Sequence, residues 1–107
     1  SKIPVVKPRD SIEYVGGSLL SQEHFNHIAQ LINYPEEARK NNIEGVVVLD
    51  FSVNIKGEVD NVKVVKSLGF GCDEEAVRVV GSLKGIDTRN PLSLKNIHRL
   101  PIRFKLR

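Results

Sequence analysis

Residues Gly45–Ser67, GVVVLDFSVNIKGEVDNVKVVKS, contain two apolar runs joined by a turn sequence. In the first run every second residue from Val47 to Ile55 is apolar, which is the period of a strand with one buried face. The turn ends at Gly57, because glycine adopts positive φ at no steric cost. The second run, Val59–Val65, is rich in β-branched residues. The whole segment therefore predicts an antiparallel β-hairpin.

The apolar pattern of the second run changes phase near its start. Val59 and Val62 cannot lie on the same face of a regular strand, since side chains alternate between the two faces. One extra residue at Asp60-Asn61 brings both valines to one face. The sequence therefore predicts a β-bulge at this dipeptide.

Three segments outside the hairpin predict helices. Apolar residues at positions 25, 28, 29 and 32 follow the helical period, with Ser21 as the expected N-cap. A short helix is expected to begin at Pro35, with acidic residues at its start, basic residues at its end and Asn41-Asn42 as its left-handed stop. Residues Asp73–Leu83 predict the last helix, with acidic residues in its first turn and one apolar face.

The end of the chain alternates again and predicts a strand. Its apolar positions are Leu100, Ile102, Phe104 and Leu106, and its basic positions are Arg99, Arg103, Lys105 and Arg107. Pro101 has no N–H to donate to a ladder, so we expect this strand to lie at a sheet edge. An edge strand is open to pairing with another chain.

Three further segments have weaker patterns. Lys2–Arg9, with two prolines, is expected to be extended, as the end of a linker. Ile12–Val15 predicts either a short strand or an apolar segment packed on the core. Ile86–Ile97 has no clear period and contains Pro91, so it predicts a surface loop.

The composition indicates one globular domain with a mixed surface. A chain of 107 residues, 40% hydrophobic and 27% charged, is large enough to form a core without metal or disulfides. The net charge of +3 comes from 16 basic and 13 acidic residues, which by itself selects no class of partner. The single cysteine excludes an internal disulfide. No apolar run approaches the roughly 18 residues of a membrane span, and a start at Ser1 without Met suggests a fragment.

Two features near residue 71 are typical of a phosphate-binding loop and of a reactive cysteine, but the acidic residues beside them disfavour both. Gly69-Phe70-Gly71 precedes a helix, as a phosphate-binding loop does, but Glu74 stands where the third glycine belongs and the first helical turn is acidic. We therefore interpret it as a strand-to-helix turn. Cys72 lies at a helix N-terminus, where a thiolate is favoured, but the same acids oppose ionisation, so a buried apolar cysteine is the preferred interpretation.

No pattern indicates catalysis or a metal site. His24 and His27 are three residues apart on a helix and His98 is remote, so solvated histidines are favoured over a zinc site. Nucleophile-elbow, Walker A and paired-carboxylate patterns are absent from the sequence, which predicts no enzyme and no cofactor. The basic row at the chain end lacks the exposed aromatics of nucleic-acid readers, so we expect no nucleic acid.

Several motifs in series resemble the C-terminal domain of TonB. They are YPEEAR at 34–39, IEGVVV at 43–48, FSV at 51–53, GEV at 57–59, VKV at 62–64, GCDEEAVRVV at 71–80 and LPIRFKL at 100–106. The motif positions singled out are Tyr34, Pro35, Ala38, Gly45, Phe51, Gly57 and Ala76. The resemblance covers about residues 11–107, with 1–10 as a linker end, and it departs at Leu83–Asn90, which lacks the family's aromatic-proline-glycine element.

The resemblance implies a fold. It is an α+β domain with a three-stranded antiparallel sheet, two helices packed on one face and an N-terminal helical extension. It also implies a periplasmic module tethered to the inner membrane by an upstream anchor, through which proton-channel partners act.

The resemblance also implies a function. The family captures the TonB-box peptide of outer-membrane receptors by strand addition and couples proton-motive force to uptake. The residues expected to bind the partner are Arg99, Leu100, Ile102, Arg103, Phe104, Lys105 and Leu106. The alternative is an interaction or regulatory module at the C-terminus of a membrane-bound sensor or antirepressor metalloprotease, or of another envelope protein. The sequence leaves open whether a homodimer forms by exchange of the edge strand.

Overall fold

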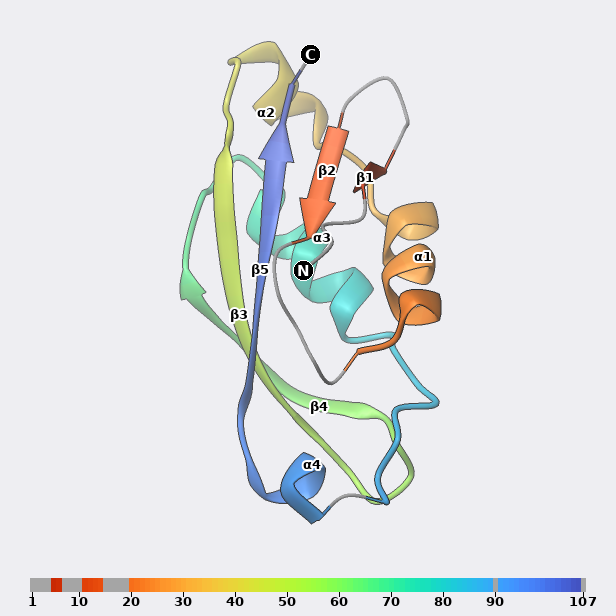
Figure 1. Cartoon of the computed structure of the whole chain (residues 1–107). Coiled ribbons are helices and arrows are strands. Elements are labelled where there is room, and N and C mark those ends of the chain that lie inside the picture. Colours follow the sequence, from red (N-terminus) through yellow and green to blue (C-terminus); the bar gives the residue numbers. More distant parts are fainter. Residues whose placement is uncertain (1–4, 7–10, 15–19, 90, 107) are drawn as a thin grey trace.

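The computed structural model describes residues 5–6, 11–14, 20–89 and 91–106, and contains one five-stranded antiparallel sheet (Figure 1). Its strands are β1 (Val5–Val6), β2 (Ser11–Tyr14), β3 (Gly45–Val53), β4 (Val59–Lys66) and β5 (His98–Lys105). They are arranged in the order β1-β2-β5-β3-β4. The predicted three-stranded sheet is confirmed as β4-β3-β5, and β2 and β1 extend it beyond β5.

The hairpin β3–β4 and its bulge are confirmed. The Gly57 N–H donates to the Asn54 carbonyl at 2.9 Å, and Gly57 has φ +78. Asp50 faces Lys63 and Ser52 faces Asp60, so two residues of β4, at positions 61 and 62, lie opposite one residue of β3. Asn61 takes up the irregularity with φ 51, in the left-handed region that asparagine tolerates.

The helices are α1 (Gln22–Leu31), α2 (Glu36–Lys40), α3 (Cys72–Val80) and α4 (Pro91–Lys95). Ser21 precedes α1 as its N-cap, and Asn42 ends the α2 region with φ 54, as predicted. Pro35 is the N-cap of α2 rather than its first helical residue. The last long helix ends at Val80, three residues before the predicted end, because Gly81 caps it.

The prediction of an unbroken loop over Ile86–Ile97 is wrong at α4. Proline suits the first position of a helix, and Pro91 begins one here. The ring N–H of His98 donates to the Ser93 carbonyl at 2.8 Å, and Ser93 is buried. Five residues are too few to show a helical period in the sequence.

One face of the sheet carries the core. Alternate residues of β3 and β5 are buried, and they form a single cluster with apolar residues of α1, α2 and α3. The helices therefore cover one face and leave the other open, in agreement with the predicted α+β class. Figure 1 shows α2 at the end of the sheet where the C-terminus lies and α4 at the opposite end.

Two charged side chains of α3 hold the connection between α1 and α2. The Asn33 N–H donates to the Glu75 carboxylate at 2.8 Å, and the Arg78 guanidinium donates to the Leu31 carbonyl at 2.9 Å. Glu75 and Arg78 also form an ion pair at 2.7 Å. Burial raises the pKa of Glu75, but the hydrogen bonds from Arg78 and Asn33 outweigh it and hold this pKa below its usual value.

The structure describes only some of the residues for which the N-terminal predictions were made. Ser11–Tyr14 forms β2, which supports the strand alternative for Ile12–Val15, while Val15 lies outside the described residues. Within the predicted linker end only Val5–Val6 is described, as β1 paired to β2. The linker interpretation stays a prediction.

Candidate functional site

The predicted partner-binding strand, β5, alternates between a core face and an exposed face. Leu100, Ile102 and Phe104 are fully buried in the core. Arg99, Arg103 and Lys105 lie on the opposite face and are exposed. The side chains expected to bind a partner therefore lie on two different faces of β5, and the apolar ones are packed in the core. Only the backbone edge and the exposed face of β5 are positioned to meet another molecule.

The prediction that β5 is an edge strand is wrong for its C-terminal half. One edge of β5 pairs with β3 from His98 to Phe104, and the other pairs with β2. The β2 ladder joins Ser11 to Lys105 and Tyr14 to Ile102, with the intervening residues in register. Partner binding by these residues stays a prediction, on an edge that already holds a strand.

The N-terminal half of the same edge differs. In the described part of the chain, no strand pairs with His98–Pro101 on the side away from β3. Among the described residues the β2 ladder reaches Ile102, the residue after Pro101, which has no N–H to offer. Pro101 therefore does not mark an edge that is open throughout, since the described β2 pairs with the residues that follow it.

Arg99 is engaged with the neighbouring strand. Its guanidinium donates two hydrogen bonds to the Asp50 carboxylate, at 2.8 and 3.0 Å, from the position opposite Asp50 in the β3–β5 ladder. The hydrogen bond and charge of Arg99 hold the pKa of Asp50 below its usual value, and Lys63 adds to the effect. Any acidic partner group at Arg99 would compete with this bidentate pair.

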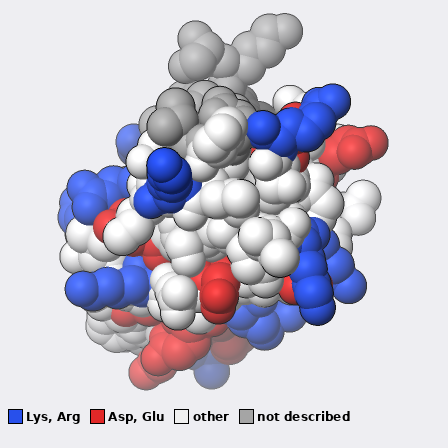
Figure 2. Space-filling model, turned by 90° about the horizontal axis from the view of Figure 1, so that it is seen from below, with Lys and Arg blue, Asp and Glu red and all other residues white. Residues whose placement is uncertain are grey.

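The chain end just beyond β5 is fixed by its backbone. The Leu106 N–H donates to the Glu44 carboxylate at 3.0 Å, and the Leu106 side chain is half-buried against the core. Arg107, the last of the predicted basic row, lies outside the described residues. Figure 2 views the opposite end of the molecule, where α4 lies, and there the basic and acidic side chains of the described residues are interspersed.

The glycine-containing turn before α3 binds a carboxylate of the same chain, that of Asp73. The Asp73 carboxylate accepts hydrogen bonds from the Leu68 N–H at 2.8 Å, the Gly69 N–H at 3.3 Å and the Ser67 hydroxyl. Burial raises the pKa of Asp73, but these hydrogen bonds outweigh it and leave the pKa lowered. The Leu68 and Gly69 N–H groups are thus bound by a carboxylate of the chain itself, and the segment leads from β4 into α3, which confirms the strand-to-helix turn.

Cys72 is the predicted buried cysteine. It is fully buried in the core cluster, and burial raises the pKa of its thiol to about 11, with Asp73 and Glu74 adding to the shift. A thiol with such a pKa is protonated at neutral pH and unreactive as a nucleophile.

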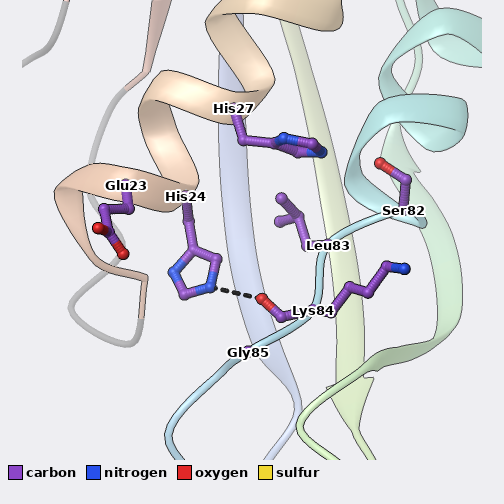
Figure 3. Close-up of a pocket in the computed structure, with 7 residues that line it drawn as sticks. All are labelled: Glu23, His24, His27, Ser82, Leu83, Lys84 and Gly85. Carbon is purple, nitrogen blue, oxygen red and sulfur yellow. Dashed lines mark hydrogen bonds between the residues drawn. The ribbon is translucent and has the colours of Figure 1, made fainter.

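His24 and His27 line one cavity of about 300 Å³ (Figure 3). The other lining residues are Glu23, Ser82, Leu83, Lys84 and Gly85. His24 Nδ1 accepts from the Ser21 N–H at 3.1 Å, so its Nε2 carries the proton and donates to the Lys84 carbonyl at 2.9 Å. His24 is therefore more than a solvated side chain, because it links the start of α1 to the segment after α3. The Ser-x-x-His spacing was a signal for the local contact with Ser21 alone.

His98 does not join the other histidines. It lies on β5, where its ring is 5.6 Å from that of Phe51. Within residues 5–6, 11–14, 20–89 and 91–106, no three His, Cys, Asp or Glu side chains are grouped so that they could hold a metal ion. The described helices include none long and apolar enough to cross a membrane.

The family-motif residues lie inside the domain. Tyr34, Ala38, Phe51 and Ala76 are buried. The Tyr34 hydroxyl donates to the Ile43 carbonyl, and its ring packs edge-on against Phe104 at 5.5 Å. This set therefore holds the helix layer against β3 and β5 and is structural.

The remaining motif positions are set by close approaches of the backbone. A Cβ at Gly45 would lie 2.7 Å from a methyl carbon of Leu68, and one at Gly57 would lie 2.6 Å from the Ile86 carbonyl oxygen. Pro35 begins α2. Larger residues at these two glycines would displace the loops that flank the hairpin.

The comparisons with known proteins gave one result. The family model described as Gram-negative bacterial TonB protein C-terminal matches residues 30–106, well over half of the chain. Neither the curated proteins nor the solved structures gave a match. The matched region contains α2, α3, α4 and β3–β5 and leaves out β1, β2 and most of α1. The chain belongs to the family of TonB C-terminal domains, which are non-enzymatic protein-interaction domains.

Proposed function

We propose that this chain is the periplasmic binding module of a TonB-type energy transducer. It captures the TonB-box peptide of an outer-membrane receptor as a strand added to the outer edge of β5. In the full-length protein an N-terminal anchor in the inner membrane joins it to proton-channel partners, so that proton-motive force drives nutrient uptake.

One observation carries the proposal beyond family membership. The edge of β5 away from β3 accepts a strand, because β2 is paired there. Backbone ladders depend little on side chains, so an edge that holds one extended segment is competent to hold another. The exposed basic residues of β5 favour a partner with acidic residues at alternate positions.

The test is an amide-shift titration of the isotope-labelled domain at physiological salt. The probes are synthetic peptides that copy the TonB boxes of candidate outer-membrane receptors. We expect shifts concentrated on His98–Leu106, and their loss when the peptide carries proline at two adjacent positions, which removes its ladder donors.

The opposite result has a clear meaning. If the amide spectrum is that of a folded domain and no peptide causes a response, the transducer proposal is contradicted. The regulatory module of a membrane-bound sensor protease or other envelope protein then becomes the better hypothesis.

A further inference from the structure

The strand β2 occupies the edge on which the proposed function depends. It forms four register pairs with β5, from Ser11 opposite Lys105 to Tyr14 opposite Ile102. It lies outside residues 30–106, which the family model matches. The binding edge of the family-matched unit is therefore partly covered by a segment of the same chain that does not belong to that unit.

The sequence of β2 fits the two faces of β5. Ile12 lies opposite Phe104 and Tyr14 opposite Ile102, so apolar residues of β2 are in register with the buried residues of β5. Ser11 and Glu13 are in register with the exposed residues Lys105 and Arg103. Cross-strand pairs of matching character stabilise a sheet, and opposite charges directly across a ladder add to this.

One edge holds one strand, because each outward N–H and C=O of β5 pairs once. Resting on the proposed function, we propose that β2 is an intramolecular competitor of the partner peptide, which displaces it from Ile102–Lys105. The incoming segment begins on His98–Leu100, the part of the edge without a paired strand in the described chain. Because the partner replaces β2, it should have the same pattern as β2: an extended segment in which apolar residues alternate with polar or acidic ones.

Occupancy by β2 lowers the apparent affinity for any partner. The apparent dissociation constant is the intrinsic one divided by the fraction of molecules whose edge is open. If β2 is docked in about nine molecules of ten, releasing it tightens partner binding about tenfold. This factor is the quantity to measure.

The first experiment compares a double proline variant, Ile12→Pro with Glu13→Pro, against the matched Ile12→Ala with Glu13→Ala. Adjacent residues of a strand direct their N–H groups to opposite sides, so one of the two positions serves the β5 ladder and proline removes its donor. Both variants lose the native side chains of Ile12 and Glu13, and only the first loses the two N–H groups.

Two probes are titrated into each variant: a TonB-box peptide and a synthetic peptide copying residues 10–15, DSIEYV. The proline variant should bind both at least about tenfold more tightly than the alanine variant. Equal binding of the TonB-box peptide by the two variants overturns the competitor while the proposed function stands. Binding of the DSIEYV peptide alone supports occlusion and contradicts the proposed function.

If neither peptide binds either variant, amide hydrogen exchange decides. Faster exchange at Ile102–Lys105 in the proline variant than in the alanine variant supports occlusion, and equal exchange overturns it.

A second experiment fixes β2 on the edge. Ser11 and Lys105 are register partners, and directly opposed antiparallel residues lie about 4.5–5.5 Å apart, within the range of a disulfide. The protein with Ser11→Cys and Lys105→Cys is its own control, since Cys72 is fully buried. The oxidised form should bind the TonB-box peptide at least about tenfold more weakly than the reduced form. Equal binding by the two forms, in a protein shown to be cross-linked, overturns the proposal.

Discussion

Single side chains that satisfy backbone groups hold the turns of this domain. Asp73 is the clearest case, because its carboxylate accepts two backbone N–H groups and the Ser67 hydroxyl in the turn between β4 and α3. A buried or half-buried donor that loses its acceptor costs the desolvation of that donor. The negative charge of the same carboxylate also interacts favourably with the positive N-terminal end of the α3 helix dipole.

We expect Asp73→Ala to lower the free energy of unfolding at pH 7 by about 1–2 kcal/mol. The pKa of Asp73 is lowered in the folded state, so the stability from its charge is present above the unfolded pKa of about 3.9. It is lost as the pH falls through the lower, folded value. Urea unfolding should therefore show a gap between wild type and variant that narrows at acidic pH. The control is Glu74→Ala, which removes a charge from the exposed neighbouring position, and an equally large loss in that variant would contradict this role for Asp73.

At the scale of elements, the β-bulge brings Val59 and Val62 of the second hairpin strand to the same face. Asn61 takes φ 51, and beyond it Val62 and Val64 pack against the core together with Val59. A β-branched residue is strongly disfavoured in the left-handed region, whereas glycine is not.

We expect Asn61→Val to lower the free energy of unfolding by about 1–2 kcal/mol. Asn61→Gly, the matched control, should stay within about 0.5 kcal/mol of wild type. Urea unfolding curves measure both. Equal stability of the two variants would mean that the bulge does not depend on the backbone conformation of residue 61.

The elements that the sequence predicts well are those with a local period. The hairpin, its bulge, α1 and α3 follow from the spacing of apolar residues and from caps such as Ser21. The neighbour of a strand is a non-local property, and the four residues of β2 are too few to identify β5 as their neighbour before the register is known. Pro101 therefore suggested a fully open edge, because its missing N–H is compatible with either an edge or the end of a ladder. The role of His24 was missed since it depends on a carbonyl sixty residues away, at Lys84.

The sequence predicted that the candidate site is a strand, but it did not predict which parts of that strand are accessible to a partner. The period of residues 100–106 identified which side chains share a face, and the structure buries three of the four apolar ones, Leu100, Ile102 and Phe104. Which edge of β5 is accessible depends on β2, and the engagement of Arg99 depends on Asp50 of β3. Both are contacts between segments far apart in the sequence.

At the scale of the whole molecule, the five strands are unequally tied to the core. β3 lies between β5 and β4, with ladders along nearly its whole length and alternate residues fully buried. β2 is joined to β5 over four residues and to β1 over two. Local stability within a protein follows such differences, since short ladders open without global unfolding. The described sheet should therefore open in order, with β1 and β2 first and β3 last.

Native-state hydrogen exchange tests this order. We expect the β2 amides to exchange faster than the central β3 amides by more than about tenfold, through openings that respond little to low concentrations of urea. The amides of Ile102–Lys105 that point toward β2 should exchange with solvent at the same rate as the β2 amides, because they lose protection when β2 leaves. β4 is the internal comparison, since in the described sheet it pairs with β3 alone but shares a hairpin turn with it. If the β2 amides instead share the exchange rate and urea dependence of β3, then β2 opens only with the whole domain, and displacement by a peptide would require global unfolding.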